Sequence, residues 1–365
     1  MPKVLVFKET LLPPSETFIL SQVCALTRFT PKMIGLEPAR ASLRLPEESI
    51  LLSKTLSSLS QLRAKVYRRT GVAPSFHRQA RRFGPDLIHA HFGHGGKSAL
   101  YLARALGIPL VTTLHGADVT VRNRFPSLYK ELIEEGALFL CDSSYLRDCA
   151  IALGFPTDKL LVHYIGVDRK QFVRGSSRSA GDDILFVGRL VEKKGCEYLL
   201  RAIQLVQHRV SRSDVTIIGD GPLRPHLEAL ARELGVHCHF AGLQPATVIR
   251  QRLQETRIFC APSVTAENGD SEGLGIVFAE AQAMGVPVVS SLHGGIPEVV
   301  VNGKTGILVP ERDHIALADA ITTLLRDRDL WQSFHMAAPI HIQDKFDLEK
   351  QTALLERRYE SVLPH

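Results

Sequence analysis

The sequence contains no apolar stretch that approaches the roughly 20 consecutive residues needed by a transmembrane helix. Its first apolar run, residues 4–7 (Val-Leu-Val-Phe), ends at Lys8-Glu9 and is too short for the core of a signal peptide. We therefore expect a cytoplasmic protein.

Paired cysteines are also absent. The six cysteines are scattered without any C-x-x-C pair, and several lie in or beside apolar runs, such as Leu140-Cys141 and Phe259-Cys260. This distribution is typical of reduced, buried thiols.

Acidic residues are missing from one long segment. The formal net charge of the chain is +6. Residues 1–170 carry 23 Lys/Arg and 14 Asp/Glu, a net +9, whereas residues 171–365 carry 21 and 24, a net −3. Residues 54–82 hold eight Lys/Arg and no acid. Such a segment could bind nucleic acid, an anionic membrane or an acidic substrate, or could be a solvated helix face.

Three cofactor or metal signatures are missing or misplaced. Residues 9–14 follow the first predicted strand without a glycine to admit a pyrophosphate, which argues against an NAD enzyme. Residues 92–98 (Phe-Gly-His-Gly-Gly-Lys-Ser) resemble a P-loop, but that pattern requires a glycine where His91 stands. Asp327-Arg-Asp329 spells the triplet of metal-dependent sugar transferases of another fold, yet it joins two predicted helices and is interpreted as a surface turn.

Four histidines, His89, His91, His94 and His115, suggest a metal site at first sight. His89 and His91 share one strand face, His94 lies in the following turn, and no cysteine or acid completes a ligand set. We therefore expect no metal and no other cofactor.

Short β-branched runs alternate with longer helical runs, which is typical of parallel βα units. At 365 residues the chain is long enough for two domains of about 150–200 residues each. The polar segment 175–181 (Gly-Ser-Ser-Arg-Ser-Ala-Gly) predicts a linker between them. We predict an α/β protein with two Rossmann-like, doubly wound domains, residues 1–172 and 182–345, that face each other across a cleft. A last helix at about 347–365 could pack back onto the first domain.

The predicted strands are residues 4–7, 32–36, 86–91, 110–114, 138–142 and 160–165 in the first domain, and 184–187, 215–218, 236–240, 258–261, 286–289 and 306–309 in the second. Predicted helices include residues 97–106, 144–153 and 196–207. In such sheets ligands bind at the carboxyl ends of the strands.

The first informative motif follows the strand predicted at 184–187. Residues 187–195 read Val-Gly-Arg-Leu-Val-Glu-Lys-Lys-Gly. At this turn Arg189 and Lys194 can place two cations on one diphosphate, and Gly188 and Gly195 permit a tight path. A basic loop without a ligand is the alternative. The next turn, residues 218–222 (Ile-Gly-Asp-Gly-Pro), contains Gly219 and places Pro222 at the expected start of a helix.

A second motif contains two acids. Residues 272–280 read Glu-Gly-Leu-Gly-Ile-Val-Phe-Ala-Glu, and we place Glu272 at a helix start where Gly273 and Gly275 expose backbone N–H groups to an anion. At about 1.5 Å per residue, Glu280 would lie on the order of 12 Å from Glu272, about the reach from a hexose through a diphosphate to a ribose. A carboxylate is the usual ligand of a ribose diol. Two surface acids are the alternative, but Glu280 stands in an apolar context where an acid needs a partner.

These motifs resemble a known family. The run 272–280, followed by residues 281–289 (Ala-Gln-Ala-Met-Gly-Val-Pro-Val-Val) and 294–298 (Gly-Gly-Ile-Pro-Glu), closely resembles the E-x7-E signature of retaining glycosyltransferases of family 4. The match includes residues 188–189, 194–195 and 219–224, and it reaches back to 165–168 and 115–118, so it covers most of the chain. The resemblance implies the GT-B fold of that family.

The resemblance also implies roles for individual residues. Arg189 and Lys194 would grip the diphosphate and stabilise it as the leaving group. Glu280 would bind the ribose, and His115 would contact the transferred sugar near the reaction centre. The transferred sugar and the β-phosphate would be held by Glu272 and by the residues that follow it, namely Gly273, Leu274, Gly275 and Ile276. Gly188 and Gly219 would belong to the same donor site.

The loop after the first predicted strand differs from the Gly-rich loop of many family members. Ser15, Glu16 and Thr17 stand there, and the Ser-Glu-Thr-Phe form is similar to the subgroup that builds exopolysaccharides and colanic-acid-type polymers. The resemblance therefore implies a nucleotide-sugar donor bound by the second domain and a lipid-linked or polysaccharide acceptor bound by the first, with residues 15–17 on the acceptor side. The basic segment could bind an anionic membrane peripherally, at its inner face; we expect no nucleic acid.

Two other classes of function remain open. A nucleotide-sugar 2-epimerase can share this fold, but it would need an acid/base set at the sugar and no acceptor groove. A non-catalytic nucleotide-sugar-binding module is the third hypothesis. The donor base, uridine or guanosine, is open as well.

Overall fold

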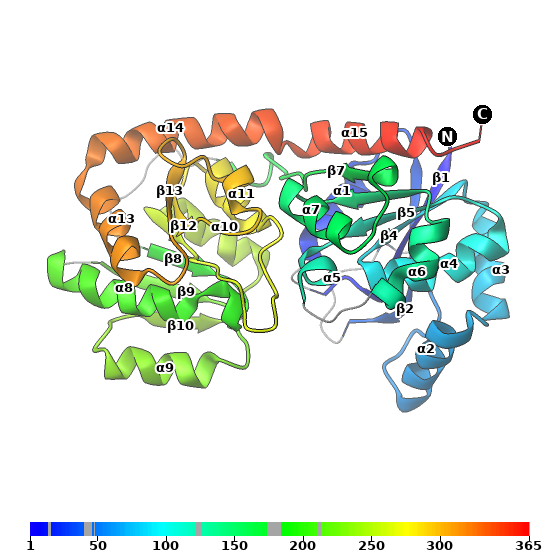
Figure 1. The fold of residues 1–365 in the computed structure, drawn as a ribbon, viewed down its shortest axis with the longest axis horizontal. Helices are drawn as coiled ribbons and strands as arrows, with labels where there is room; N and C mark the ends of the chain where they lie inside the picture. The colour runs from blue at the N-terminus through cyan, green and yellow to red at the C-terminus, as the bar shows by residue number, and fades with distance from the viewer. Residues whose placement is uncertain are drawn as a thin grey trace. The chain divides into compact units, whose positions relative to one another are not determined.

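The computed structural model describes residues 1–13, 16–39, 46, 48–121, 126–173, 184–210 and 213–364, with backbone alone for 126–128. The chain divides into two compact units (Figure 1). The first unit is Met1–Gly166 with Leu348–His365, and the second is Val167–Asp347. The predicted linker at 175–181 lies outside the described residues.

The first unit contains a seven-stranded parallel sheet in the order β3-β2-β1-β4-β5-β6-β7. Its strands are β1 (Lys3–Leu11), β2 (Thr30–Pro38), β3 (Ile50–Leu51), β4 (Leu87–His91), β5 (Leu110–Leu114), β6 (Leu138–Cys141) and β7 (Leu160–Val162). Its helices are α1 (Thr17–Ala25), α2 (Ser58–Thr70), α3 (Pro74–Phe83), α4 (Gly93–Leu106), α5 (Gly116–Thr120), α6 (Pro126–Glu135), α7 (Ser144–Ala152) and α15 (Leu348–Glu360).

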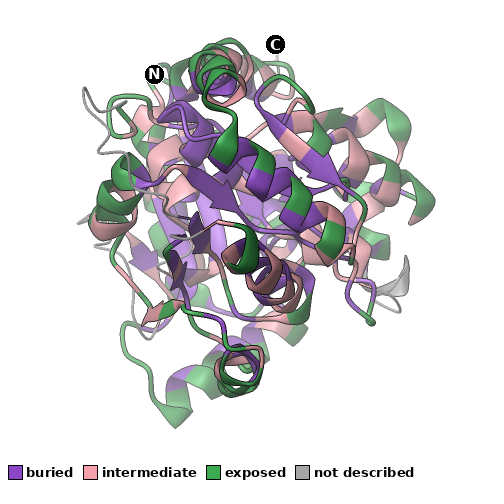
Figure 2. Ribbon diagram, turned by 90° about the vertical axis from the view of Figure 1, so that its left-hand side faces the viewer, coloured by how far each residue is buried: buried purple, intermediate pink, exposed green. Residues whose placement is uncertain are grey.

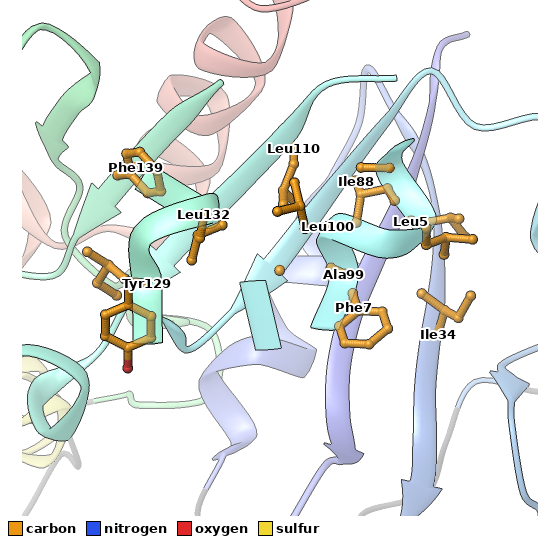
Figure 3. Close-up of a cluster of buried hydrophobic side chains, with 14 of the residues drawn as sticks. Leu5, Phe7, Ile34, Ile88, Ala99, Leu100, Leu110, Tyr129, Leu132 and Phe139 are labelled. Atoms are coloured by element: carbon orange, nitrogen blue, oxygen red, sulfur yellow. The ribbon is translucent and has the colours of Figure 1, made fainter. Parts of the chain in front are cut away.

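Helices cover both faces of this sheet because its strands are apolar on both sides. Leu5 and Phe7 of β1 belong to one buried cluster, which includes residues of α2, α3, α4, α6 and α7 (Figure 3). The alternate residues Val4 and Val6 belong to a second cluster with α1 and α15. The period of two that separates the clusters is the side-chain alternation of a strand.

The last helix, α15, is tied to the first unit by buried polar contacts. The Glu356 carboxylate accepts hydrogen bonds from the backbone N–H groups of Thr27 and Arg28 at 2.7 and 2.6 Å. The hydroxyl of Tyr359 lies 2.6 Å from Nδ1 of His89.

The second unit contains a six-stranded parallel sheet in the order β10-β9-β8-β11-β12-β13. Its strands are β8 (Ile184–Val187), β9 (Val215–Ile218), β10 (His239–Gly242), β11 (Ile258–Cys260), β12 (Val288–Ser291) and β13 (Gly306–Val309). Its helical segments are a 3-10 turn (Glu192–Lys194), α8 (Cys196–Arg209), α9 (Arg224–Glu233), α10 (Ala246–Glu255), α11 (Ile276–Ala283), α12 (Ile296–Val299), α13 (His314–Arg326) and α14 (Arg328–Lys345).

The strand order reverses once in each sheet, between β1 and β4 in the first unit and between β8 and β11 in the second. Loops that leave such a switch point diverge above and below the sheet, and ligands of doubly wound folds bind there. The loops after β8 and β11 carry residues 188–195 and 261–275, which include the cationic motif and the first acid of the acidic motif.

Several element boundaries differ from the predicted ones. The first sheet contains a seventh strand, β3, that was not predicted, because a strand of two residues leaves no periodic pattern in the sequence. Helix α4 begins at Gly93 rather than 97, directly after Phe92, whose φ is 69°. Strand β10 begins at His239 rather than 236, because Val236 still donates a hydrogen bond to Ala231 at the end of α9.

Three local predictions also need correction or support. Pro222 does not start a helix, because the backbone N–H of Leu223 donates a hydrogen bond to the backbone oxygen of Leu190. Helix α9 begins at Arg224, with Pro225 in its first turn. All six cysteines are free, as predicted, but Cys24 is exposed because α1 buries Ile19 and Val23 instead. In the ribbon coloured by burial (Figure 2), the helices carry a mixture of buried, intermediate and exposed residues. The Asp327 side chain accepts a hydrogen bond from Leu330 N–H and caps α14, which confirms a helix-joining turn.

Candidate active site

The cationic and acidic motifs of the second unit meet at the β8/β11 switch point. Lys194, at the end of the 3-10 turn after β8, donates a hydrogen bond from Nζ to the carboxylate of Glu272 in the loop after β11. The two side chains are only 16% and 10% exposed. Burial alone would raise the pKa of Glu272, but Lys194 and Lys193 lower it to about 2. Glu272 is therefore ionised at neutral pH.

The neighbouring lysine holds the preceding part of the same loop. Lys193 Nζ lies 2.9 Å from Asp270 and donates to the backbone oxygen of Ser271 at 3.4 Å. Its own backbone oxygen accepts a hydrogen bond of 2.8 Å from Val264. Two consecutive lysines thus fasten the loop after β8 to the loop after β11.

Arg189 is different from both lysines. Its side chain is exposed and makes no hydrogen bond or ion pair with any described residue. Gly188 lies beside Lys194, since a Cβ at Gly188 would sit 3.6 Å from the Lys194 Cδ atom. Gly219 has a φ of +138°, and a Cβ there would lie 1.8 Å from the backbone oxygen of Gly188, so the two loops touch through their main chains.

Glu272 does not stand at a helix start, contrary to the prediction. Helix α11 begins at Ile276, and Gly273 and Leu274 are buried in the loop before it. Gly275, with a φ of +76°, is the N-cap and has no side chain to accept from the first N–H groups of α11. The spacing expected for one continuous helix from Glu272 to Glu280 therefore does not apply.

Glu280 lies in the second turn of α11. It is half-buried and forms no hydrogen bond or ion pair within the described part of the chain. Burial raises its pKa to about 7, and the more distant charge of Arg250 opposes this only in part. An acid in this state lacks a partner and gains from any ligand that donates hydrogen bonds to it.

In the first unit, His115 follows β5 and precedes α5. Its Nδ1 lies 2.6 Å from Asp142, and its Nε2 lies 3.3 Å from Nδ1 of His91. Burial alone would lower the pKa of His115, but Asp142, Asp118 and Glu16 raise it above its ordinary value. Burial keeps the pKa of His91 well below its ordinary value. Nδ1 of the neutral His91 ring can therefore accept a hydrogen bond from Nε2 of a protonated His115.

Glu16 and Thr17 lie at the start of α1, whereas Ser15 is outside the described residues. Glu16 forms a 2.7 Å ion pair with Lys8, a buried lysine of β1 whose Nζ also lies 4.7 Å from the ring centre of Phe92. Burial raises the pKa of Glu16 despite this partner. The charges of Glu16 and His115 are thus electrostatically coupled within one unit.

Two family models of known proteins match the chain, one largely within each unit. A family model described as Glycosyltransferase Family 4 matches residues 40–171, and one described as Glycosyl transferases group 1 matches residues 181–327. The chain belongs to glycosyltransferase family 4.

Two relatives and one solved structure show how far the likeness of this family 4 chain extends. WcaL of Salmonella typhimurium, provisionally assigned as a colanic acid biosynthesis glycosyltransferase, is 33% identical over 69% of this chain and 64% of WcaL. AmsK of Erwinia amylovora, an amylovoran biosynthesis glycosyltransferase, is 34% identical over 66% of this chain and 62% of AmsK. The matches therefore span less than two thirds of these relatives. HepE of Anabaena, solved in complex with UDP and glucose, has a TM-score of 0.78 at 20% identity over 99% of this chain and 100% of that one, which confirms the GT-B fold.

Sequence reasoning missed several polar residues that contact the predicted ones within each unit. In the first unit Asp142 contacts His115. In the second unit they are Lys193, His293 and Glu311; His293 accepts a hydrogen bond from Glu272 and donates one to Glu311. Asp142 and His293 stand directly or nearly after β6 and β12, so a search of strand ends for polar residues would have found them.

No group of three or more His, Cys, Asp or Glu side chains in the described ranges could hold a metal ion. His94 belongs to the first turn of α4 rather than to a separate turn after β4. Among the described helices none is both long and apolar enough to cross a bilayer.

Proposed function

We propose that the chain is a retaining hexosyltransferase that moves a sugar from a UDP- or GDP-sugar to a lipid-linked or polysaccharide acceptor in exopolysaccharide-type biosynthesis. The observation that carries the proposal is the Lys194–Glu272 ion pair at the β8/β11 switch point, with Arg189, which has no ion pair among the described residues, on the same loop as Lys194. The names of WcaL and AmsK and the UDP in HepE support the donor class and the biosynthetic setting.

The donor would be bound through its charged and hydroxyl groups. Arg189 and Lys194 would bind the diphosphate, and Glu280 would accept hydrogen bonds from the ribose diol. Glu272, with the N–H groups of residues 273–276, would hold the transferred sugar and the β-phosphate. Arg189 is exposed and Glu280 has no partner among the residues that the structure describes, so a bound nucleotide would lower the free energy of both groups.

Stabilisation of the departing diphosphate by Arg189 and Lys194 would be the main catalytic contribution. Glu272 is paired with Lys194, so the sequence and the described residues offer no evident nucleophile for a double displacement. An oxygen of the leaving diphosphate would instead take the proton of the acceptor on the same face of the sugar. His115 would contact the sugar; because both its ring nitrogens have partners, a contact through Nε2 would require its bond to His91 to break.

A panel of nucleotide sugars tests this function against its alternatives. Release of nucleoside diphosphate that rises with added acceptor supports transfer, whereas a changed sugar still attached to the nucleotide would establish a 2-epimerase. Binding without either product would leave a binding module. Assays with both UDP- and GDP-sugars identify the base.

The stereochemistry has its own test. An α-linked donor should give an α-linked product by NMR, and enzyme quenched with donor alone should carry no added hexose by mass spectrometry. A β-linked product would refute retention, and a trapped adduct would refute the single-face mechanism.

Peripheral binding to an anionic membrane is the second part of the proposal, and helix α2 supports it. The helix buries Ser60, Ala64 and Tyr67, while the apolar side chains of Leu59, Leu62 and Val66 are 59%, 55% and 44% exposed. These three recur at helical spacing on the outer side.

Basic side chains lie on the same exposed helix. Arg63, Lys65 and Arg69 are exposed, whereas Arg68 turns inward to ion pairs with Glu9 and Glu37 at 2.8 and 3.3 Å. Exposed apolar side chains flanked by cations are typical of helices that lie in the interface of anionic bilayers.

Liposome flotation tests the membrane role. Leu59→Ser with Leu62→Ser should lower binding to anionic vesicles at least about tenfold, since burying each leucine contributes about 1.5–3 kcal/mol. Ile340→Ser is the control, because Ile340 is 58% exposed on α14 of the second unit. Binding by the double variant equal to wild type would refute insertion of α2, and binding unaffected by salt would refute the contribution of the basic residues.

A further inference from the structure

His293 lies in the loop between β12 and α12 and is only 4% exposed. Its Nε2 accepts a hydrogen bond of 3.1 Å from the backbone N–H of Glu272, and its Nδ1 lies 2.7 Å from Oε1 of Glu311. A ring nitrogen that accepts from an N–H group carries no proton, so the ring proton of His293 is on Nδ1 and is donated to Glu311. Glu311 thereby selects the tautomer that can bind Glu272.

The Glu311 side chain is kept as an ionised carboxylate, which can only accept hydrogen bonds. Its Oε2 accepts a hydrogen bond of 2.7 Å from the backbone N–H of Thr265. Burial alone would raise the pKa of Glu311, but the hydrogen bonds from Thr265 and His293 lower it below its ordinary value. An ionised carboxylate has no proton to donate, so the ring of His293 cannot reverse its tautomer against it.

The other side of the Glu272 peptide is held by the same loop. Its backbone oxygen accepts a hydrogen bond of 3.1 Å from Gly295 N–H. Gly294 has a φ of +53°, and a Cβ there would lie 2.2 Å from that oxygen, so only glycine allows this approach. Both polar groups of the Glu272 peptide are therefore fixed by residues 293–295, which leaves only side-chain rotation to the carboxylate.

We propose that His293, in the tautomer set by Glu311, is a positioning residue that places the Glu272 carboxylate against the transferred sugar. The inference rests on the role proposed above for Glu272. His293 acts through the backbone of Glu272 and not on the substrate. Displacement of a sugar-holding group by about 1 Å can cost on the order of a hundredfold in rate, so a fixed peptide matters for turnover.

Two substitutions of His293 distinguish its hydrogen bond with Glu272 from its hydrogen bond with Glu311. His293→Gln keeps an oxygen near the position of Nε2 that can still accept from Glu272, whereas His293→Asn keeps a donor near Nδ1 and loses that acceptor. We expect His293→Asn to lower kcat at least about tenfold with little change in the donor KM, and His293→Gln to restore most of that loss, because the lost bond fixes a group that acts in the transition state. Calorimetry should show wild-type affinity for free nucleoside diphosphate in both variants. Equal kcat values for the two variants, or wild-type kcat in His293→Asn, would overturn the inference.

Glu311→Gln tests whether Glu311 sets the tautomer of His293, and it leaves the buried histidine ring in place. It should lower kcat by less than His293→Asn, because an amide can present either an acceptor or a donor to Nδ1. Arg312→Gln is the matched control, since Arg312 donates a 2.6 Å hydrogen bond to the backbone oxygen of Thr265 and has none to His293 in the part of the chain described. An equal loss in Arg312→Gln would mean that anchoring of Thr265 is responsible, and the inference would be wrong.

Glu272→Gln distinguishes failure of this inference from failure of the proposed function. Unchanged transfer in Glu272→Gln would remove the role of Glu272 itself. Lost transfer in Glu272→Gln combined with normal kcat in His293→Asn would remove only the positioning role of His293.

Discussion

Glu272 and Glu280 are the first and last residues of one nine-residue run, but Glu272 lies in the loop before α11 and Glu280 lies within that helix. In the loop two acids have a cationic partner: Glu272 pairs with Lys194 and Asp270 with Lys193. In the helix Glu280 has no hydrogen-bonding partner among the described residues. The pKa of Glu272 is accordingly lowered to about 2, by the lysines against the effect of burial, and burial raises that of Glu280 to about 7.

This difference teaches how the same residue type can be prepared for two tasks. Glu272 already has a cationic partner without a ligand, so a donor diphosphate that binds Lys194, as proposed, would compete with Glu272 for it. The environment of Glu280 is incomplete, so a hydroxyl-bearing ligand improves it directly.

The largest effect is expected from Lys194→Ala. Removing one partner of a buried pair typically costs about 3–5 kcal/mol, because the other charge remains buried without compensation. We expect the free energy of unfolding to fall by about 3 kcal/mol in denaturant titrations, and turnover to fall at least tenfold.

The double variant Lys194→Ala with Glu272→Gln supplies the control for that result. It should regain part of the lost stability, since no charge is left unpaired, but none of the lost turnover. A single variant as stable and active as the wild type would show that the pair contributes to neither property.

The Glu280→Gln variant is expected to have the next largest effect. If Glu280 binds the ribose, loss of a charged hydrogen bond worth about 1.5–3 kcal/mol should weaken binding of free nucleoside diphosphate about tenfold or more in calorimetry. Glu272→Gln should bind the free nucleotide normally and fail in sugar transfer. Wild-type nucleotide binding by both variants would show that Glu280 has been assigned wrongly.

A smaller effect concerns the pH dependence of stability. The folded protein holds a proton on Glu280 up to a pKa of about 7, above the ordinary value of 4.5, so the folded state binds more protons than the unfolded state between these values. The contribution of Glu280 to stability therefore falls as the pH rises from about 4.5 to 7. Between pH 5 and pH 8 the wild type should lose about 1–2 kcal/mol more than Glu280→Gln in denaturant titrations. Parallel pH profiles for the two proteins would contradict the proposed state of Glu280.

No effect is expected from chelation. If Arg189 and Lys194 neutralise the leaving diphosphate without help, EDTA should leave turnover unchanged within error. Full loss of activity that Mg²⁺ or Mn²⁺ restores would show that the cations of the β8 loop are insufficient.

The sequence predicted the sheets well because buried parallel strands consist of short apolar runs, such as residues 184–187 and 110–114, that match β8 and β5. The residues of the E-x7-E run could be found because their spacing is local. The pairing of Lys194 with Glu272 could not be predicted from the sequence, because 78 residues separate the two and only the strand order brings their loops together. His293 and Glu311 were not predicted for the same reason. Strand β3 was not predicted because its two residues are too few to show a periodic pattern.

The main-chain contacts at Gly219 and Gly294 have an evolutionary consequence. At each of these positions the backbone oxygen of another loop occupies the place of a Cβ atom, at 1.8 Å for Gly219 and 2.2 Å for Gly294. Any side chain added at either position would push two loops apart. If these loops bind the donor, as proposed, a change in donor preference is therefore expected to come from exposed side chains near them. A mutant library aimed at a new donor would leave both glycines untouched and randomise exposed neighbours such as Leu243. Leu243 is 78% exposed and follows Gly242, whose backbone oxygen accepts a hydrogen bond of 2.9 Å from Gly219.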